Sequence, residues 1–291
     1  MILLSAVILG GLGLMMGLGL SLAYKKLAVK NDPRSERILE ILPGGNSGAC
    51  GFAGCRAYAE AVTEGKVAPD LCCVGGEDVS RKIAKIMGVE LVIREKQIAL
   101  IRCRGGNKEA KEKFDYQGIK DCRAALLTAG GKKGCIYGCL GLGTCVASCP
   151  FGAISMREND LPKIDENKCV GCGRCVESCP REIIELVPRT QRIFVLCRSQ
   201  DKAKQVKEVC EVGCIGCGLC VKVCPVGAIV LENNLPRINP NICVACGECV
   251  KKCPTHSIWL VKNVPGRKER EISMDKFVQS NFEFKKEKEK K

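Results

Sequence analysis

The distribution of apolar and polar residues divides the chain into segments of different character. Met1–Tyr24 carries no charge and consists mainly of Leu, Ile, Val, Met and Gly, and about twenty apolar residues suffice for a helix to cross a membrane core. Periodicity predicts helices over Arg56–Glu64 and around Ser80–Met87. A strand is expected around Ile98–Arg102. The lysine-rich chain beyond Pro265 is predicted to be disordered.

Four runs of cysteines, each ended by Cys-Pro, carry the most specific chemistry. Three of them follow C-x2-C-x2-C-x3-C-P, the spacing with which bacterial ferredoxins bind [4Fe-4S] clusters. Zinc is the competing interpretation, but structural zinc sites use cysteine pairs that close locally with four ligands. Iron–sulfur clusters are therefore favoured. The runs are Cys135/Cys139/Cys145/Cys149, Cys169/Cys172/Cys175/Cys179, Cys214/Cys217/Cys220/Cys224 and Cys243/Cys246/Cys249/Cys253.

The runs belong to an internal duplication. ENDLPKID at 158–165 recurs as ENNLPRIN at 232–239, and a pair of cysteine runs accompanies each copy. Short strands, such as Ala153–Arg157 and Pro162–Ile164, are expected between the runs, and each run is expected to continue into a short helix. The sequence thus predicts two duplicated two-cluster ferredoxin-like units in a small α+β fold.

In a two-cluster unit, the fourth cysteine of each run ligates the other cluster. The first set is the least regular, because Leu142 stands where the duplication places Cys217. Cys210 matches Cys135 in the duplication and is a less favoured alternative ligand of the third set. The expected sets are Cys135, Cys139, Cys145 and Cys179; Cys149, Cys169, Cys172 and Cys175; Cys214, Cys217, Cys220 and Cys253; and Cys224, Cys243, Cys246 and Cys249.

Cys103, Cys122, Cys197 and Cys210 remain outside these sets. Buried free cysteines behave as small apolar residues, and that interpretation is favoured for all four. An accessory role stays open, because IRCRGGNKEAK around Cys103 resembles VLCRSQDKAKQ around Cys197.

Composition narrows the classes of function. The 291 residues include 24 cysteines and only 4% aromatic residues, so clusters are expected to organise much of the fold. Disulfide scaffolds are typical of short secreted chains and are disfavoured. The formal net charge of +14 counts cysteines as neutral, whereas five clusters of charge roughly −2 would cancel about ten of those charges. Nucleic-acid binding is therefore not expected.

The sequence contains no convincing nicotinamide- or flavin-binding motif and no candidate catalytic base. Gly11-Leu-Gly13 lies in the apolar N-terminal segment and not after a strand, so it is no dinucleotide fingerprint. His256 is the only histidine and directly follows a cysteine run. No catalytic residue is assigned, and the chain itself is expected to transfer electrons only.

A different cysteine arrangement precedes the ferredoxin-like units. The segment LPGGNSGACGFAGCRAYAEAV and the following LCCVGG supply Cys50, Cys55 and Cys72, with Cys73 adjacent. They resemble the N-terminal cluster domain of the Rnf complex B subunit, a family with one membrane helix before this domain and ferredoxin repeats after it. The resemblance extends to about residue 262. The family pattern C-x2-C-x4-C-x16-C has Ser47 at its first position here. Cys73 is favoured as the replacement ligand, while ligation by Ser47 or loss of one iron stays open.

The resemblance implies a subunit of a translocase, the ferredoxin:NAD oxidoreductase that exports sodium or protons. Its metal-binding cysteines would hold about five [4Fe-4S] clusters for electron transport. Soluble ferredoxin would supply electrons, and other membrane and flavoprotein subunits of the Rnf complex would receive them. An electron-relay subunit of a membrane-bound hydrogenase or formate dehydrogenase is the alternative, and a cluster-based redox sensor is a third hypothesis.

Lys25 and Lys26 follow the apolar segment directly. By the positive-inside rule, a single transmembrane pass in the bacterial cytoplasmic (inner) membrane would leave the cluster domains on the cytoplasmic side. A cleaved signal peptide is the alternative, but no basic region precedes the apolar run.

The expected organisation is an anchor (1–24), a linker (25–40), an N-terminal 4Fe-4S module (41–76), a connecting α/β region (77–130), ferredoxin-like unit 1 (131–189), unit 2 with its lead-in (190–262) and a basic tail (263–291).

Overall fold

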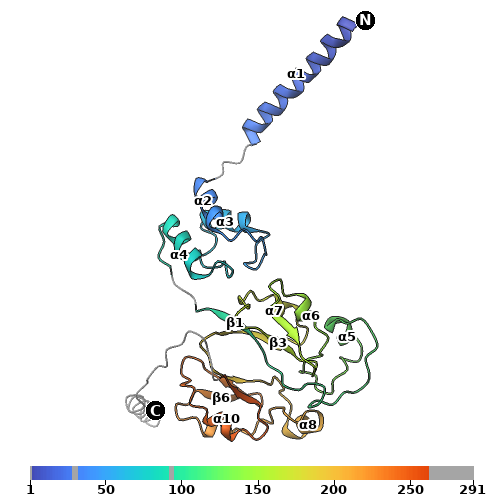
Figure 1. Ribbon diagram of the computed structural model, residues 1–291, viewed down its shortest axis with the longest axis vertical. Coiled ribbons are helices and arrows are strands. Elements are labelled where there is room, and N and C mark those ends of the chain that lie inside the picture. The colour runs from blue at the N-terminus through green and yellow to red at the C-terminus, as the bar shows by residue number, and fades with distance from the viewer. Residues whose placement is uncertain (1, 28–31, 92–94, 262–291) are drawn as a thin grey trace. The chain divides into compact units, whose positions relative to one another are not determined.

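The computed structural model describes residues 2–27, 32–91 and 95–261, and the predicted tail beyond residue 262 lies outside these ranges. The described residues fall into two units, one before residue 92 and one after it (Figure 1). The first unit opens with helix α1 (Ile2–Leu27). Within it, Ile8–Lys26 has a mean hydropathy of 1.4 and is long and apolar enough to cross a membrane, a property that signal sequences share.

The remainder of the first unit is a three-helix module around one small core. Helices α2 (Pro33–Ile41), α3 (Cys55–Thr63) and α4 (Gly76–Met87) pack together. Ile38, Tyr58 and Ile83, one from each helix, are buried in a core that also contains Cys72. Their burial fixes the cysteine-bearing loop between α3 and α4 against the helices.

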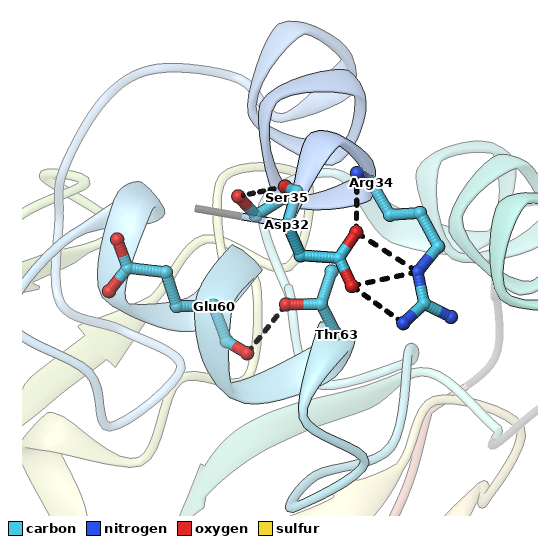
Figure 2. A network of polar contacts seen from close by, with 5 residues as sticks. All are labelled: Asp32, Arg34, Ser35, Glu60 and Thr63. Atoms are coloured by element: carbon cyan, nitrogen blue, oxygen red, sulfur yellow. Dashed lines mark hydrogen bonds and ion pairs between the residues drawn. The ribbon is translucent and has the colours of Figure 1, made fainter. Parts of the chain in front are cut away.

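Helix α2 occupies a segment that was expected to be a linker. Asp32 is its N-cap and Pro33 its first residue, a combination that satisfies the free N–H groups of a helix start. Figure 2 shows the Asp32 carboxylate accepting hydrogen bonds from the backbone N–H of Arg34 at 2.8 Å and from its guanidinium, whose Nη2 lies 2.6 Å away. The Ser35 hydroxyl donates to the Asp32 carbonyl at 2.8 Å. The hydrogen bonds from Arg34 hold the pKa of Asp32 below its ordinary value.

The second unit contains two similar halves, and each half contains two pairs of antiparallel strands. In both halves, a lead-in strand pairs antiparallel with the strand that ends that half, and a hairpin lies between the cysteine runs. The first half comprises β1 (Gln97–Ile101), α5 (Cys122–Leu127), α6 (Thr144–Ala147), β2 (Ile154–Met156), β3 (Pro162–Ile164), α7 (Arg174–Ser178) and β4 (Ile184–Pro188). The second comprises β5 (Ile193–Val195), α8 (Ala203–Val209), α9 (Leu219–Lys222), β6 (Ile229–Glu232), β7 (Leu235–Ile238), α10 (Glu248–Lys252) and β8 (Ile258–Leu260).

The two halves contact each other through equivalent residues. Arg104, after β1, donates to the His256 carbonyl and lies 5.0 Å from the centroid of the Trp259 ring. Arg198, after β5, pairs with Glu182 at 3.1 Å. Glu182 and His256 occupy matching positions with φ of 49° and 52°. The junction is therefore reciprocal, as expected for a duplicated unit packed against its copy.

The predicted elements appear close to their expected bounds. Helix α3 and strand β1 start one residue before the predicted segments, α4 starts four residues before its segment, and β3 coincides with its predicted range. The compact division falls after Leu91, because α4 packs on the N-terminal core while β1 pairs with β4 in the second unit.

Candidate functional site

Each cysteine run adopts the same local shape, a loop followed by a short helix. The third cysteine lies inside the helix and is buried in all four runs, and the fourth follows the helix directly or within two residues. Glycine makes the loops possible. Gly216 has φ +63°, and a Cβ there would lie 2.7 Å from the Asn234 carbonyl oxygen. A side chain would clash with the hairpin, so the loop can close over the cysteines only with glycine at this position.

One cavity in the second half, with a volume of about 10 Å³, is lined by Cys214, Cys217, Cys220 and Cys253. Burial acts to raise the pKa of Cys253, but hydrogen bonds from Ser257 and nearby backbone amides outweigh it, so that the pKa is lowered. The Ser257 hydroxyl is fully buried and lies 3.4 Å from the Cys253 sulfur. This position favours a thiolate.

In the first half, a cavity of about 20 Å³ is lined by the last cysteine of the first run and three cysteines of the second run, Cys149, Cys169, Cys172 and Cys175. Backbone N–H groups of Ala153 and Ala99 donate to the sulfurs of Cys149 and Cys169 at 3.4 and 3.5 Å. Burial, followed by the charges of Cys169 and Cys172, raises the pKa of Cys175 to about 12. The charges of Cys169 and Cys172 act on Cys175 because these three sulfurs lie close together.

Cys224, Cys243, Cys246 and Cys249 form a further group in the second half. Burial raises the pKa of Cys249 to about 12, and the other three thiolates of the group contribute in the same direction. The Ala228 N–H donates to the Cys224 sulfur at 3.3 Å, just as Ala153 does to Cys149. The two halves thus repeat the same sulfur-directed hydrogen bond.

The first expected set is arranged differently from the prediction. Cys139, Cys145 and Cys179 line one cavity of about 20 Å³, but the fourth cysteine there is Cys122. Its backbone N–H donates to the Thr144 hydroxyl at 2.7 Å, which ties the start of α5 to the residue before Cys145. Cys122 thereby lies beside the cysteines of the run in which Leu142 stands at the place of a cysteine.

Cys135 lies in another cavity, which it lines together with Cys103, Cys197 and Cys210. Burial raises the pKa of Cys135 to about 11, with smaller contributions in the same direction from the charges of these three cysteines. The four residues that the spacing left over or assigned elsewhere are therefore neighbours in the fold.

The N-terminal cysteines gather at the core of the first unit. Cys72 is buried, and Cys50 and Cys55 pack against the same core. Burial raises the pKa of Cys72, and the charges of Cys50 and Cys55 act in the same direction. The Gly75 N–H donates to the Cys72 sulfur at 3.4 Å. Three of the expected sulfurs thus face one region, whereas ligation by Cys73 or Ser47 stays a prediction.

The arrangement suits a cluster better than a single ion. Among the residues that the structure describes, no three His, Cys, Asp or Glu side chains come close enough to hold one metal ion. A cubane requires a wider arrangement, because each of its thiolates binds a different iron.

Sequence reasoning missed Cys122 as a partner of the first group. Leu142 could have indicated it, because it stands where the duplicated run has Cys217. A run that lacks one of its cysteines can complete a group of four only with a cysteine from another segment. No periodic pattern pointed to Cys122, because the hydrogen bond that places it joins residues 22 positions apart.

Comparison with known families and proteins agrees with this geometry. The model of a 4Fe-4S dicluster domain matches residues 134–183, 168–228 and 213–257, and that of a putative Fe-S cluster matches residues 42–74. The first group of matches spans all four cysteine runs, and the second spans Cys50, Cys55, Cys72 and Cys73. The chain therefore carries several [4Fe-4S] sites in two kinds of module.

Three curated relatives extend the similarity to most of the chain. The B subunit of the ion-translocating oxidoreductase complex of Methanosarcina acetivorans is 43% identical over 81% of this chain and 89% of its own length. The B subunits of the Na(+)-translocating ferredoxin:NAD(+) oxidoreductase complex of Acetobacterium woodii and of the proton-translocating complex of Clostridium ljungdahlii are 46% and 48% identical. They align over 80% and 79% of this chain, and over 70% and 82% of their own lengths. The chain belongs to the family of the B subunits of ion-translocating oxidoreductase (Rnf) complexes.

Proposed function

We propose that this chain is the multi-cluster electron-transfer subunit of an Rnf-type complex. It would take electrons from reduced soluble ferredoxin and pass them toward flavin-carrying subunits that reduce NAD, coupled to sodium or proton translocation. The observation that carries the proposal is the gathering of cysteines from distant segments into four-sulfur groups in a chain of this family. A relay subunit of a hydrogenase or formate dehydrogenase is not favoured, because the relatives are Rnf subunits over most of their length.

Four groups in the second unit are proposed as ligand sets. Bound [4Fe-4S] clusters exchange single electrons, at potentials tuned by hydrogen bonds to sulfur and by exposure. The protein supplies those hydrogen bonds from Ala153, Ala228 and Ser257. The sets are Cys122, Cys139, Cys145 and Cys179; Cys149, Cys169, Cys172 and Cys175; Cys214, Cys217, Cys220 and Cys253; and Cys224, Cys243, Cys246 and Cys249.

Exchange of the fourth cysteine would couple the clusters within each half. Cys179 and Cys253 end the second run of their halves but line the cavity of the first run. Cys149 likewise ends the first run and lines the cavity of the second. Each cluster pair is thus bridged by a few residues of backbone, an arrangement that favours rapid electron exchange.

Family membership and the apolar helix α1 fit a membrane-associated protein. We further propose a single pass through the cytoplasmic membrane. Lys25 and Lys26 lie in the last turn of α1, and by the positive-inside rule they would hold the cluster-bearing units on the cytoplasmic side.

Affinity purification of the native membrane complex under anaerobic conditions tests the proposed function. A tag on this chain is expected to recover multi-spanning membrane subunits and a flavoprotein, and the assembly should oxidise reduced ferredoxin with NAD as acceptor. Recovery of a hydrogenase or formate dehydrogenase catalytic subunit in their place would contradict the proposal.

The fourth ligand of the N-terminal site gives a separate prediction. We propose Cys73, because a thiolate is the better iron ligand and Cys73 is adjacent to Cys72. Cys73→Ala is expected to remove the N-terminal cluster, or about four irons per chain, while Ser47→Ala retains them. The measurement is iron and acid-labile sulfide per chain for both variants. Full iron in Cys73→Ala together with loss in Ser47→Ala would assign the ligand to Ser47.

A further inference from the structure

A fourth cavity in the second unit is lined by Cys103, Cys135, Cys197 and Cys210. It has about 30 Å³, against 10 to 20 Å³ in the three cavities lined by proposed ligand sets. None of its four cysteines forms a disulfide. Protein interiors are close-packed, and here four thiols line an open space instead of packing against one another.

Each half of the second unit contributes two equivalent cysteines. Cys103 stands two residues after the end of β1, and Cys197 two residues after the end of β5. Cys135 and Cys210 each precede by four residues the first cysteine of a group, Cys139 and Cys214. The set is therefore complete only where the two halves meet.

The contacts of these sulfurs resemble those of the proposed ligands. The Cys139 N–H donates to the Cys103 sulfur at 3.5 Å, and the Cys214 N–H donates to the Cys197 sulfur at 3.3 Å. Similar bonds of 3.3 to 3.5 Å reach the sulfurs of Cys149, Cys169 and Cys224. Donors of this kind stabilise a negatively charged sulfur.

The space above Gly105 shows that two of the sulfurs point to one spot. A Cβ on this glycine would lie 3.1 Å from the Cys210 sulfur and 4.0 Å from the Cys103 sulfur. Gly105 thus leaves room where the two sulfurs converge. A side chain there would intrude on the Cys210 sulfur and the cavity.

A buried cation lies at the same cavity. Lys133 is fully buried, lines the cavity and donates to the Gly105 carbonyl. A buried ammonium is costly unless an opposite charge compensates it, and a cubane with four thiolates carries a net charge of roughly −2. The charge that Lys133 requires is the charge that a cluster would bring.

We propose that Cys103, Cys135, Cys197 and Cys210 hold a further [4Fe-4S] cluster at the junction of the two halves. Each thiol releases one proton on binding iron, and the assembled site takes one electron from one half and gives it to the other. The position is distinct from the four ligand sets proposed above. Only this transfer role rests on the proposed function; the binding site stands on the geometry.

Substitutions on opposite halves test the site by their lack of additivity. Iron, zinc and acid-labile sulfide per chain are measured in the anaerobically purified full-length protein and in Cys103→Ala, Cys197→Ala and the double variant. Because both residues would serve one cluster, each single variant and the double variant should lose the same four irons and four sulfides. Val206→Ala, which removes volume from the lining of the same cavity without removing sulfur, should lose none.

Full iron in either cysteine variant would overturn the proposal, as would a loss of eight irons in the double variant, which would mean two separate clusters. If Val206→Ala lost as much iron as the cysteine variants, the loss would be an effect of packing, and the proposal would be overturned. Zinc at this site in the unsubstituted protein, in place of iron, would also overturn the proposal. The iron, zinc and sulfide contents do not depend on whether ferredoxin and flavoprotein partners are recovered. The proposed function and the proposed site can therefore be disproved separately.

Discussion

Cys220→Ala is expected to remove one whole cluster, or about four irons and four sulfides per chain. Cys220 is buried in α9 and lines one cavity together with Cys214, Cys217 and Cys253. A cubane that has lost one of four thiolates in a buried site is poorly held, and its binding free energy is also folding free energy. We therefore expect loss of electron transfer through the second half together with a lower temperature of unfolding.

The matched control is Val221→Ala, one residue further along α9. Val221 packs on the same core but is not a proposed ligand, so it should cost about 1 kcal/mol in packing and leave the iron content unchanged. Iron analysis and thermal unfolding of the anaerobic proteins compare the two variants. Equal iron in Cys220→Ala and the unsubstituted protein would contradict the ligand assignment.

Two arginines within α1 are expected to release the chain from the membrane. Leu14 and Leu18 lie inside the apolar window Ile8–Lys26. Replacing a central leucine by arginine costs about 3 kcal/mol of insertion free energy on the translocon scale. Leu14→Arg with Leu18→Arg should therefore disfavour insertion by about 6 kcal/mol, and the chain should move from the membrane pellet to the supernatant.

The measurement is the share of chain that stays in carbonate-washed membranes when it is expressed without partner subunits. Leu14→Ala with Leu18→Ala is the control, since alanine is nearly neutral on that scale and should leave the chain in the membrane. A double arginine variant that stays in the membrane, or an unsubstituted chain found entirely in the supernatant, would contradict a retained anchor.

Local spacing predicted much of the candidate site because its ligands are mostly local. In the strict runs three of four cysteines fall within seven residues, and the glycines and helix that shape the loop lie among them. The short strand Pro162–Ile164 was predicted at its observed bounds, since it lies between two motifs that recur together. The family resemblance was likewise readable from cysteine order, and the relatives confirm it.

The positions that sequence reasoning did not place depend on contacts between distant segments. Cys122 reaches the first group through a hydrogen bond to Thr144, and Cys103 meets Cys210 only after the two halves have packed. Helix α2 was also missed, because a polar segment with Pro33 appears as a linker unless Asp32 is recognised as an N-cap. Spacing describes one loop at a time and carries no information on which loops meet.

The most direct measurement is iron, acid-labile sulfide and zinc per chain in protein purified without oxygen, together with Mössbauer spectra. Five [4Fe-4S] clusters correspond to about 20 irons and 20 sulfides, and the junction site would bring both to about 24. Spectra typical of cubanes with those amounts are the predicted result. Protein that is folded and rich in zinc, or that contains scarcely any iron and sulfide, would contradict an electron-transfer role for these cysteines.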